Sequence, residues 1–81
     1  MDKNRLYWAS RRGMLELDLV LKPFLDNHFD TLPDEDKVLY EQLLEEQDPD
    51  LFQWFVHGAE PATDGLKRIV EIIRERTRES V

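Results

Sequence analysis

A short segment near the N-terminus gathers side chains that could recognise another molecule. An indole, two guanidiniums, a glycine and a carboxylate fall within nine residues: Trp8, Arg11, Arg12, Gly13 and Glu16. Glycine lets a backbone or a ligand approach closely, and if Gly13 joins two helices, Arg12 and Glu16 can lie close in space. The segment is a candidate docking point. The alternative is that Trp8 packs in the core, Gly13 is only a hinge, and Arg12 and Glu16 form an exposed ion pair contributing less than about 1 kcal/mol.

The rest of the sequence offers little basis for catalysis or metal binding. It contains no cysteine, so a thiolate nucleophile, a thiolate metal site and a disulfide are all excluded. His28 and His57 are too few for a structural zinc site without identified carboxylate ligands. Clustered acids such as Glu45 and Glu46 stand in capping or solvated positions, where acid–base work would need burial to separate their pKa values. We predict no catalytic residue and no metal ligand.

Helical patterns account for the whole chain. Its 81 residues allow one domain, and the Pro and Gly residues fall where helices begin and end. We expect helices at about residues 4–12, 14–29, 31–46, 48–58 and 63–75. Asn4 and Thr63 are the expected caps of the first and last helices, and Thr31 with Pro33 marks the start of the third. The prediction is an all-α fold, a compact bundle of about five short helices in a single domain over residues 1–81, with residues 76–81 frayed.

Apolar positions on these helices predict the core. In the second helix Pro23 should bend the chain between Leu19 and Pro23, and the Leu-Glu-Leu-Asp-Leu run beginning at Leu15 also alternates as a strand would, although no second strand exists to pair with it. The residues expected to face inward are Leu17, Val20, Leu21 and Phe24 in the second helix, Leu51, Phe52, Phe55 and Val56 in the fourth, and Leu66, Ile69, Val70 and Ile73 in the last.

Charge is distributed unevenly along the chain. The net charge is -7, and residues 13–60 hold thirteen acids against only Lys22 and Lys37. Such a surface repels phosphate backbones and favours a basic partner face, although acidity also keeps a small protein soluble without any partner. We expect no nucleic-acid binding. No apolar run approaches the roughly 18 residues that span a bilayer, and the first residues lack the apolar stretch of a secretory signal. We therefore expect a cytoplasmic monomer without membrane insertion.

Three stretches of the sequence resemble a known family. Arg12-Gly13-Met14-Leu15-Glu16 matches the Arg-Gly-x-x-Glu hallmark of the bacterial FAD assembly factors that help attach flavin covalently to the flavoprotein subunit of succinate dehydrogenase. The surrounding run WASRRGMLELDLVLKPFL, then a Leu-Pro-x-x-Asp helix start, and later DPDLFQWF follow in the family's order across about residues 7–59.

The resemblance implies a non-enzymatic, chaperone-like helper. It implies a bundle of about five helices that binds the flavoprotein subunit of succinate dehydrogenase, and often of fumarate reductase, and promotes a bond between FAD and a histidine of that partner. The chain itself would hold no cofactor stably, since FAD is attached to the partner. By the motif, Arg12, Gly13 and Glu16 would face the partner, with Arg11 and Trp8 alongside.

Two other interpretations belong to different functional classes. A small acidic helical chain also fits an antitoxin or a regulatory adaptor that binds another protein, and co-purification with a small toxin would distinguish that function. A flavin transferase would need a nucleotide or metal site, and the sequence contains no pattern that predicts one.

Overall fold

The computed structural model describes residues 2–79, and within this range every regular element is a helix. The elements are α1 (Lys3–Ser10), α2 (Leu15–Asn27), the 3-10 turn η1 (Phe29–Thr31), α3 (Asp34–Leu43), α4 (Asp48–Phe55) and α5 (Asp64–Glu79). The predicted all-α bundle of about five short helices is confirmed. No helix in the described part of the chain has the length and apolar character needed to cross a bilayer.

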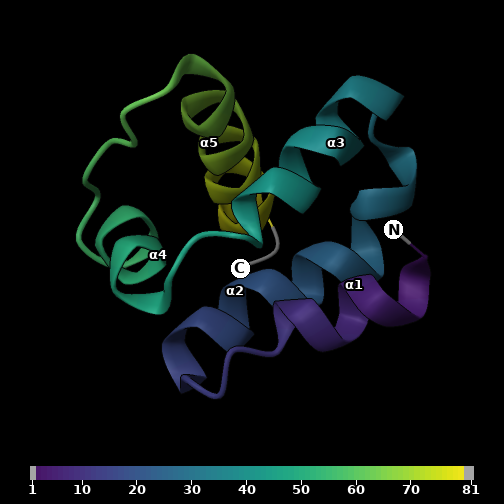
Figure 1. Ribbon diagram of the computed structural model, residues 1–81, viewed down its shortest axis with the longest axis horizontal. Coiled ribbons are helices and arrows are strands. Elements are labelled where there is room, and N and C mark those ends of the chain that lie inside the picture. The colour runs from purple at the N-terminus through teal and green to yellow at the C-terminus, as the bar shows by residue number, and fades with distance from the viewer. Residues whose placement is uncertain (1, 80–81) are drawn as a thin grey trace.

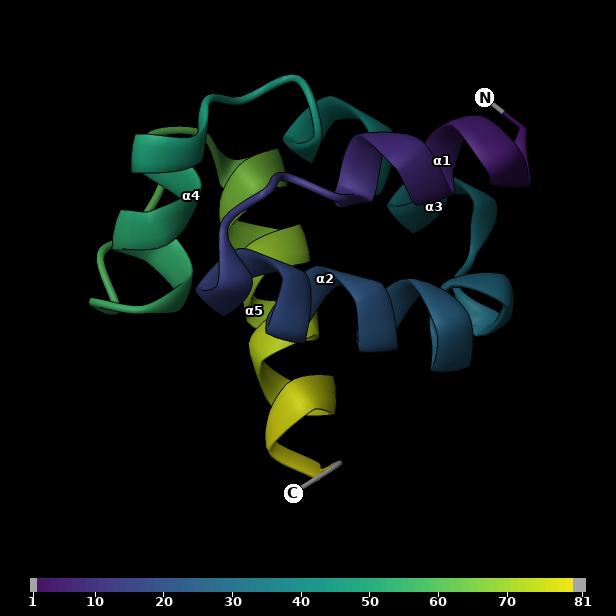
Figure 2. The ribbon, with the colours of Figure 1, turned by 90° about the horizontal axis from the view of Figure 1, so that it is seen from below.

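Helix α2 is the central element of the bundle. It contacts α1, α4 and α5, and α3 packs mainly against α5. Figures 1 and 2 show α1 running back along α2, with α4 near the start of α2 and α5 crossing α2. The molecule measures 28 × 26 × 25 Å along its principal axes. With these neighbours, α2 carries a face of fully buried residues.

Side chains and proline rings define where the helices begin. The Asp2 carboxylate caps α1 by accepting the Arg5 backbone N–H at 2.9 Å, so the prediction of Asn4 as the cap was wrong, and Asn4 lies inside the helix. Thr31 is not the cap of α3 either. Its hydroxyl donates to the His28 carbonyl at 2.7 Å and closes η1, while the fixed φ of Pro33 leads into α3.

The start of α5 agrees with the sequence prediction. The Thr63 hydroxyl accepts the Leu66 backbone N–H at 3.3 Å, as expected of a cap. Helix α5 continues to Glu79, and residues 80–81 lie outside the described residues. The fraying expected for residues 76–81 stays a prediction, as does the bend at Pro23, which lies inside α2.

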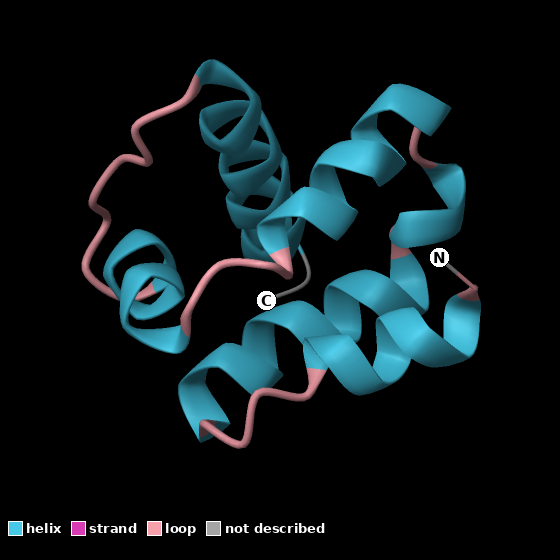
Figure 3. Cartoon of the chain, in the orientation of Figure 1, coloured by secondary structure: helices cyan, strands magenta, loops and turns pink. Residues whose placement is uncertain are grey.

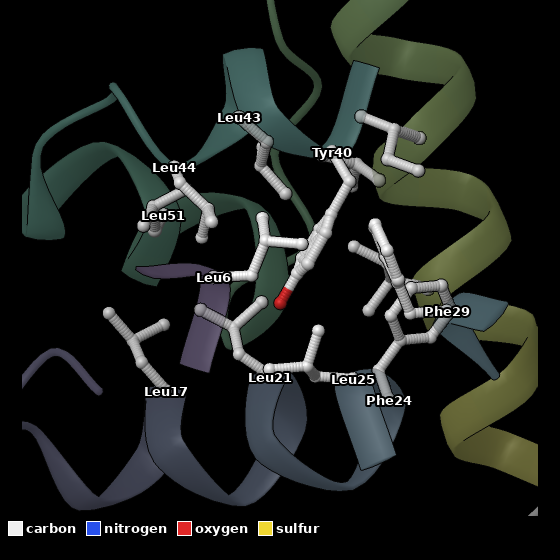
Figure 4. Close-up of a cluster of buried hydrophobic side chains, with 13 residues drawn as sticks. Leu6, Leu17, Leu21, Phe24, Leu25, Phe29, Tyr40, Leu43, Leu44 and Leu51 are labelled. Atoms are coloured by element: carbon white, nitrogen blue, oxygen red, sulfur yellow. The ribbon is translucent and has the colours of Figure 1, made fainter. Parts of the chain in front are cut away.

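One apolar cluster joins all the helices (Figure 4). The fully buried residues are Leu6 of α1, Leu17, Leu21, Phe24 and Leu25 of α2, Tyr40 and Leu43 of α3, Leu51 of α4, and Ile69, Val70 and Ile73 of α5, with Phe29 and Leu44 nearly so. The predicted inward positions of α2 and α5 are confirmed except for Val20 and Leu66, which are only partly buried.

The prediction for α4 and the residue after it is confirmed for Leu51 and in part for Phe55. Leu51 is buried and Phe55 is partly buried against the core, whereas Phe52 is half-buried outside that cluster and Val56 is 43% exposed. A helix of eight residues at the edge of the bundle turns a single face to the core, so neighbouring positions point elsewhere.

Two polar contacts are built into this small core. The Tyr40 hydroxyl lies 2.7 Å from the Ser10 hydroxyl, which ties α3 to the end of α1. Burial disfavours the phenolate and raises the pKa of Tyr40 to about 12. The buried Asp36 carboxylate of α3 accepts two hydrogen bonds, at 2.8 and 3.2 Å, from the largely exposed guanidinium of Arg68 in α5.

Candidate functional site

The loop between α1 and α2 carries the centre of the candidate site. This loop, residues 11–14, is drawn in pink in Figure 3. Gly13 has a φ of +78°, a conformation that costs other residues strain. A Cβ built on Gly13 would meet no atom within 4 Å, so its outer face is open. The prediction that Gly13 separates two helices is confirmed, and its backbone is available for close approach.

Arg12, by contrast, turns its side chain into the protein. Its Nε donates to Asp48 Oδ1 at 2.7 Å, and its Nη1 donates to the carbonyls of Ala9 at 3.0 Å and Leu44 at 2.9 Å. Its Nη2 donates to the Glu46 carbonyl. Only 14% of the Arg12 side chain is exposed. The guanidinium therefore joins the α1–α2 loop to the segment between α3 and α4.

Glu16 lies in the first turn of α2 with its side chain in solvent. The alternative that Arg12 and Glu16 form an exposed ion pair does not hold, because the Arg12 side chain is mostly buried and its guanidinium binds Asp48 and backbone carbonyls. Asp48 stands at the first residue of α4, 36 positions along the chain. Sequence spacing within the motif gives no signal of that contact.

Trp8 and Arg11 lie together on the surface beside the loop. The Trp8 side chain is 66% exposed, which excludes the alternative that it packs in the core. The Arg11 guanidinium carbon lies 5.5 Å from the centre of the Trp8 ring, within the range of a cation–π contact. An exposed indole next to a cation is the kind of side-chain pair that interfaces use as an anchor.

Two leucines beside Glu16 were missed as candidate contact residues. Leu15 is 68% exposed and Leu19 is 63% exposed, whereas Leu17 between them is fully buried. Positions four apart share one face of a helix, so Leu15 and Leu19 form an outward apolar pair at the start of α2. The alternating leucines at positions 15, 17 and 19 could have indicated this exposed pair. Leucines at every second position of a helix cannot all lie on its buried face, so some of them must be exposed.

Other parts of the molecule offer weaker candidates. A shallow groove of about 320 Å³ is lined by residues of α2, α4 and α5 that include Val20, Val56 and Arg74, and none of the motif residues lines it. Within residues 2–79, no three side chains of His, Asp or Glu are grouped so that they could hold a metal ion. The best candidate is the set of exposed residues at the end of α1, in the loop and at the start of α2, named here the loop surface: Trp8, Arg11, Gly13, Leu15, Glu16 and Leu19.

Comparisons with known proteins point in one direction. A family model described as flavinator of succinate dehydrogenase (Sdh5) matches residues 4–77. The chain is 44% identical over 78 residues to the FAD assembly factor SdhE of Pectobacterium atrosepticum, covering 96% of this chain and 89% of the relative. It is 46% identical over 77 residues to the same factor of a Serratia species, covering 95% and 88%, and 52% identical over 77 residues to that of Shewanella oneidensis, covering 94% and 93%.

Proposed function

This chain belongs to the family of flavinators of succinate dehydrogenase and is an FAD assembly factor, and we propose that it works by docking its loop surface onto the flavoprotein subunit of that enzyme. The observation that carries this proposal is the open face of Gly13 at a positive φ, placed beside exposed Trp8 and Glu16. A backbone without a Cβ and without covering atoms lets a partner approach to contact distance.

The interface is centred on Gly13 and Glu16, with Arg11 and Trp8 alongside, and Arg12, the remaining motif residue, supports it from inside the protein. Trp8 supplies an aromatic anchor, and the exposed side chains of Leu15 and Leu19 add apolar contact area to the interface. Glu16 supplies a charge that can pair with a basic group and fix the register. These exposed side chains come from the end of α1 and the start of α2. Loss of one of them is therefore expected to affect binding more than folding.

The helper acts by holding a conformation of its partner. Forming a bond between the flavin and a histidine depends on orienting the isoalloxazine ring against that histidine and on stabilising the charge that develops on the ring. Both groups belong to the partner. In this proposal the chain supplies no catalytic residue and binds no cofactor stably, FAD being attached to the partner. It works as a monomer in the cytoplasm and also serves the flavoprotein subunit of fumarate reductase.

Co-expression tests this function directly. The flavoprotein subunit of succinate dehydrogenase is produced in a host that lacks its own assembly factor, with and without this chain, and covalent flavin is read as fluorescence of the denatured subunit in a gel. We expect strong signal only with the chain and recovery of a one-to-one complex with the subunit. Equal signal in both cultures, or co-purification with a small toxin in place of the flavoprotein, would contradict the proposal.

A further inference from the structure

We propose that Arg12 is a positioning residue whose guanidinium, together with Asp48 and Asp18, anchors the α1–α2 loop so that Gly13 and the neighbouring exposed side chains are held ready for the partner. This inference rests on the proposed function, since it names how part of the loop surface works. It assigns Arg12 a role inside the protein, and it gives roles to two acids, Asp18 and Asp48, that lie outside the Arg-Gly-x-x-Glu motif.

The hydrogen-bonding capacity of Arg12 is almost fully used within the chain. A guanidinium has five N–H donors, and four of its hydrogen bonds end on Asp48, Ala9, Leu44 and Glu46. Only 14% of the side chain is exposed. A partner group would have to displace these acceptors, including a charge-assisted bond to Asp48, which is among the stronger kinds of hydrogen bond. The geometry thus favours an internal role.

The acceptors of Arg12 are groups that need a donor. Leu44 and Glu46 follow the last residue of α3, and helix ends leave carbonyls without a partner inside the helix. Cations are favoured at that end of a helix because of its dipole. Arg12 therefore stabilises the turn after α3 and, through Asp48, the first residue of α4. Three elements are joined by one side chain.

The backbone of Arg12 is anchored as well. Its N–H donates to Asp18 Oδ1 at 2.9 Å, so an acid of the first turn of α2 reaches back over the loop. The next residue, Gly13, has no side chain to restrict it, and glycine loses more conformational freedom on folding than other residues. Fixing both the backbone and the side chain of residue 12 holds Gly13 in one conformation before the partner arrives, which lowers the entropic cost of binding.

A double-mutant cycle distinguishes this role from direct contact with the partner. The variants are Arg12→Ala, Asp48→Ala and the double variant, with Asp48→Glu as the conservative rescue. The initial rate of flavinylation is measured on purified apo-flavoprotein subunit with FAD, over a range of chain concentrations, so that the half-saturating concentration and the maximal rate are separated. Hydrogen exchange of the amides of residues 12–14 is followed by NMR on each free chain.

A matched control uses the other acid–arginine contact of the fold. Asp36→Ala removes the carboxylate that Arg68 binds between α3 and α5, away from the α1–α2 loop. This variant loses a buried acid as Asp48→Ala loses a half-buried one. Any variant is compared at a temperature where circular dichroism shows that it is folded. We expect Asp36→Ala to lower the melting temperature and to keep the wild-type half-saturating concentration.

A positioning role predicts a coupled pattern. Arg12→Ala and Asp48→Ala should each raise the half-saturating concentration by about tenfold with a smaller effect on the maximal rate, and the double variant should be no worse than Arg12→Ala alone. Both should speed exchange at residues 12–14, and Asp48→Glu should restore both readouts. If Asp48→Ala leaves the half-saturating concentration and the exchange unchanged while Arg12→Ala abolishes activity, Arg12 contacts the partner and the inference is overturned.

The two measurements distinguish a failure of the proposed function from a failure of the positioning role of Arg12. If the wild-type chain does not accelerate flavinylation at all, the helper function is contradicted. The exchange measurement still decides about the anchor, because it needs no partner: faster exchange at residues 12–14 in Asp48→Ala supports it, and unchanged exchange overturns it.

Discussion

Single residues of the α1–α2 region divide into an inner and an outer set. Arg12 and Leu17 point into the protein, and Trp8, Leu15 and Leu19 point into solvent. Large exposed apolar side chains that gather beside charged groups mark interaction sites. Their substitution changes little of the folded chain's packing, so binding and stability can be separated by experiment here.

Trp8→Ala tests this separation. We expect the free energy of unfolding, measured by urea denaturation, to change by less than about 0.5 kcal/mol because the side chain is mostly exposed. Affinity for the flavoprotein subunit should fall by at least about fivefold, as for an aromatic anchor worth more than about 1 kcal/mol. Val38→Ala on α3, at 49% exposure, is the control and should leave both quantities unchanged. Equal affinities for Trp8→Ala and wild type would remove Trp8 from the interface.

The sequence predicts local features of this region better than contacts between residues that are distant in the chain. The place of Gly13 between two helices was predicted from its residue type and the local pattern. The contact between Arg12 and Asp48 does not, because it joins residues that are distant in the chain and depends on how α3 and α4 are placed. Leu15 and Leu19 were ambiguous for a similar reason: one helical turn does not reveal which side faces the neighbours.

Contacts between elements add specificity to a core made mostly of leucine. Ser10 closes α1 and Tyr40 lies in α3, and their hydroxyls meet in a site where both side chains are fully buried. Figure 4 shows the Tyr40 side chain reaching from α3 toward Leu6 and Leu21. Removal of one hydroxyl would leave the other in an apolar site without its partner, and that cost exceeds the net value of the bond itself.

Tyr40→Phe gives a pH-dependent prediction. Near neutral pH the variant should be less stable than wild type by about 1–3 kcal/mol, because Ser10 loses its buried partner. The folded chain holds the pKa of Tyr40 at about 12, above the ordinary value of about 10. As the pH rises above 10 the unfolded wild-type chain releases the phenol proton first, so folding is disfavoured.

The size of this effect follows from linkage. Wild type should lose about 1.4 kcal/mol from this group by pH 11, and Tyr40→Phe, which cannot ionise there, should not. The difference in free energy of unfolding between the two chains should therefore narrow between pH 9 and pH 11 in urea denaturation series. A constant difference over that range would show that burial does not hold the Tyr40 proton.

Element types were more predictable than element boundaries. The apolar spacing of α2 and α5 predicts both helices and most of their buried faces. The capping residues were harder to predict. Thr63 was predicted correctly, but the caps of α1 and α3 are Asp2 and Pro33, where Asn4 and Thr31 were expected. Several polar residues near a helix start can each cap it, and packing decides among them.

The net charge of the whole molecule is large, and the charged residues are distributed unevenly along the chain. The net charge is -7, and the first residues are basic while residues 13–60 are acidic. Basic and acidic residues are interleaved along α5. A field of this kind affects how fast two proteins meet more than how tightly they hold each other.

Charge neutralisation tests whether the acidic region assists the encounter. Glu35→Gln with Glu45→Gln, both exposed in or after α3, should lower the association rate constant with the flavoprotein subunit several-fold and weaken its dependence on salt. The dissociation rate constant should stay the same. Glu71→Gln with Glu75→Gln on α5 changes the net charge equally and serves as control, to be compared by surface plasmon resonance. If both pairs of substitutions lowered the association rate constant equally, the acidic region would have no special role in the encounter with the subunit.

If the open face of Gly13 docks onto the flavoprotein subunit, the added side chain of Gly13→Arg should block that docking. Gly58→Arg is a matched control, because Gly58 has a φ of +76° and equally open space for a Cβ. Both variants carry the same new side chain and a similar strain of about 1–2 kcal/mol. With both confirmed as folded, covalent flavin is measured on the co-expressed subunit. We predict that Gly58→Arg retains flavinylation and Gly13→Arg abolishes it; equal signal from the two would contradict docking through this loop.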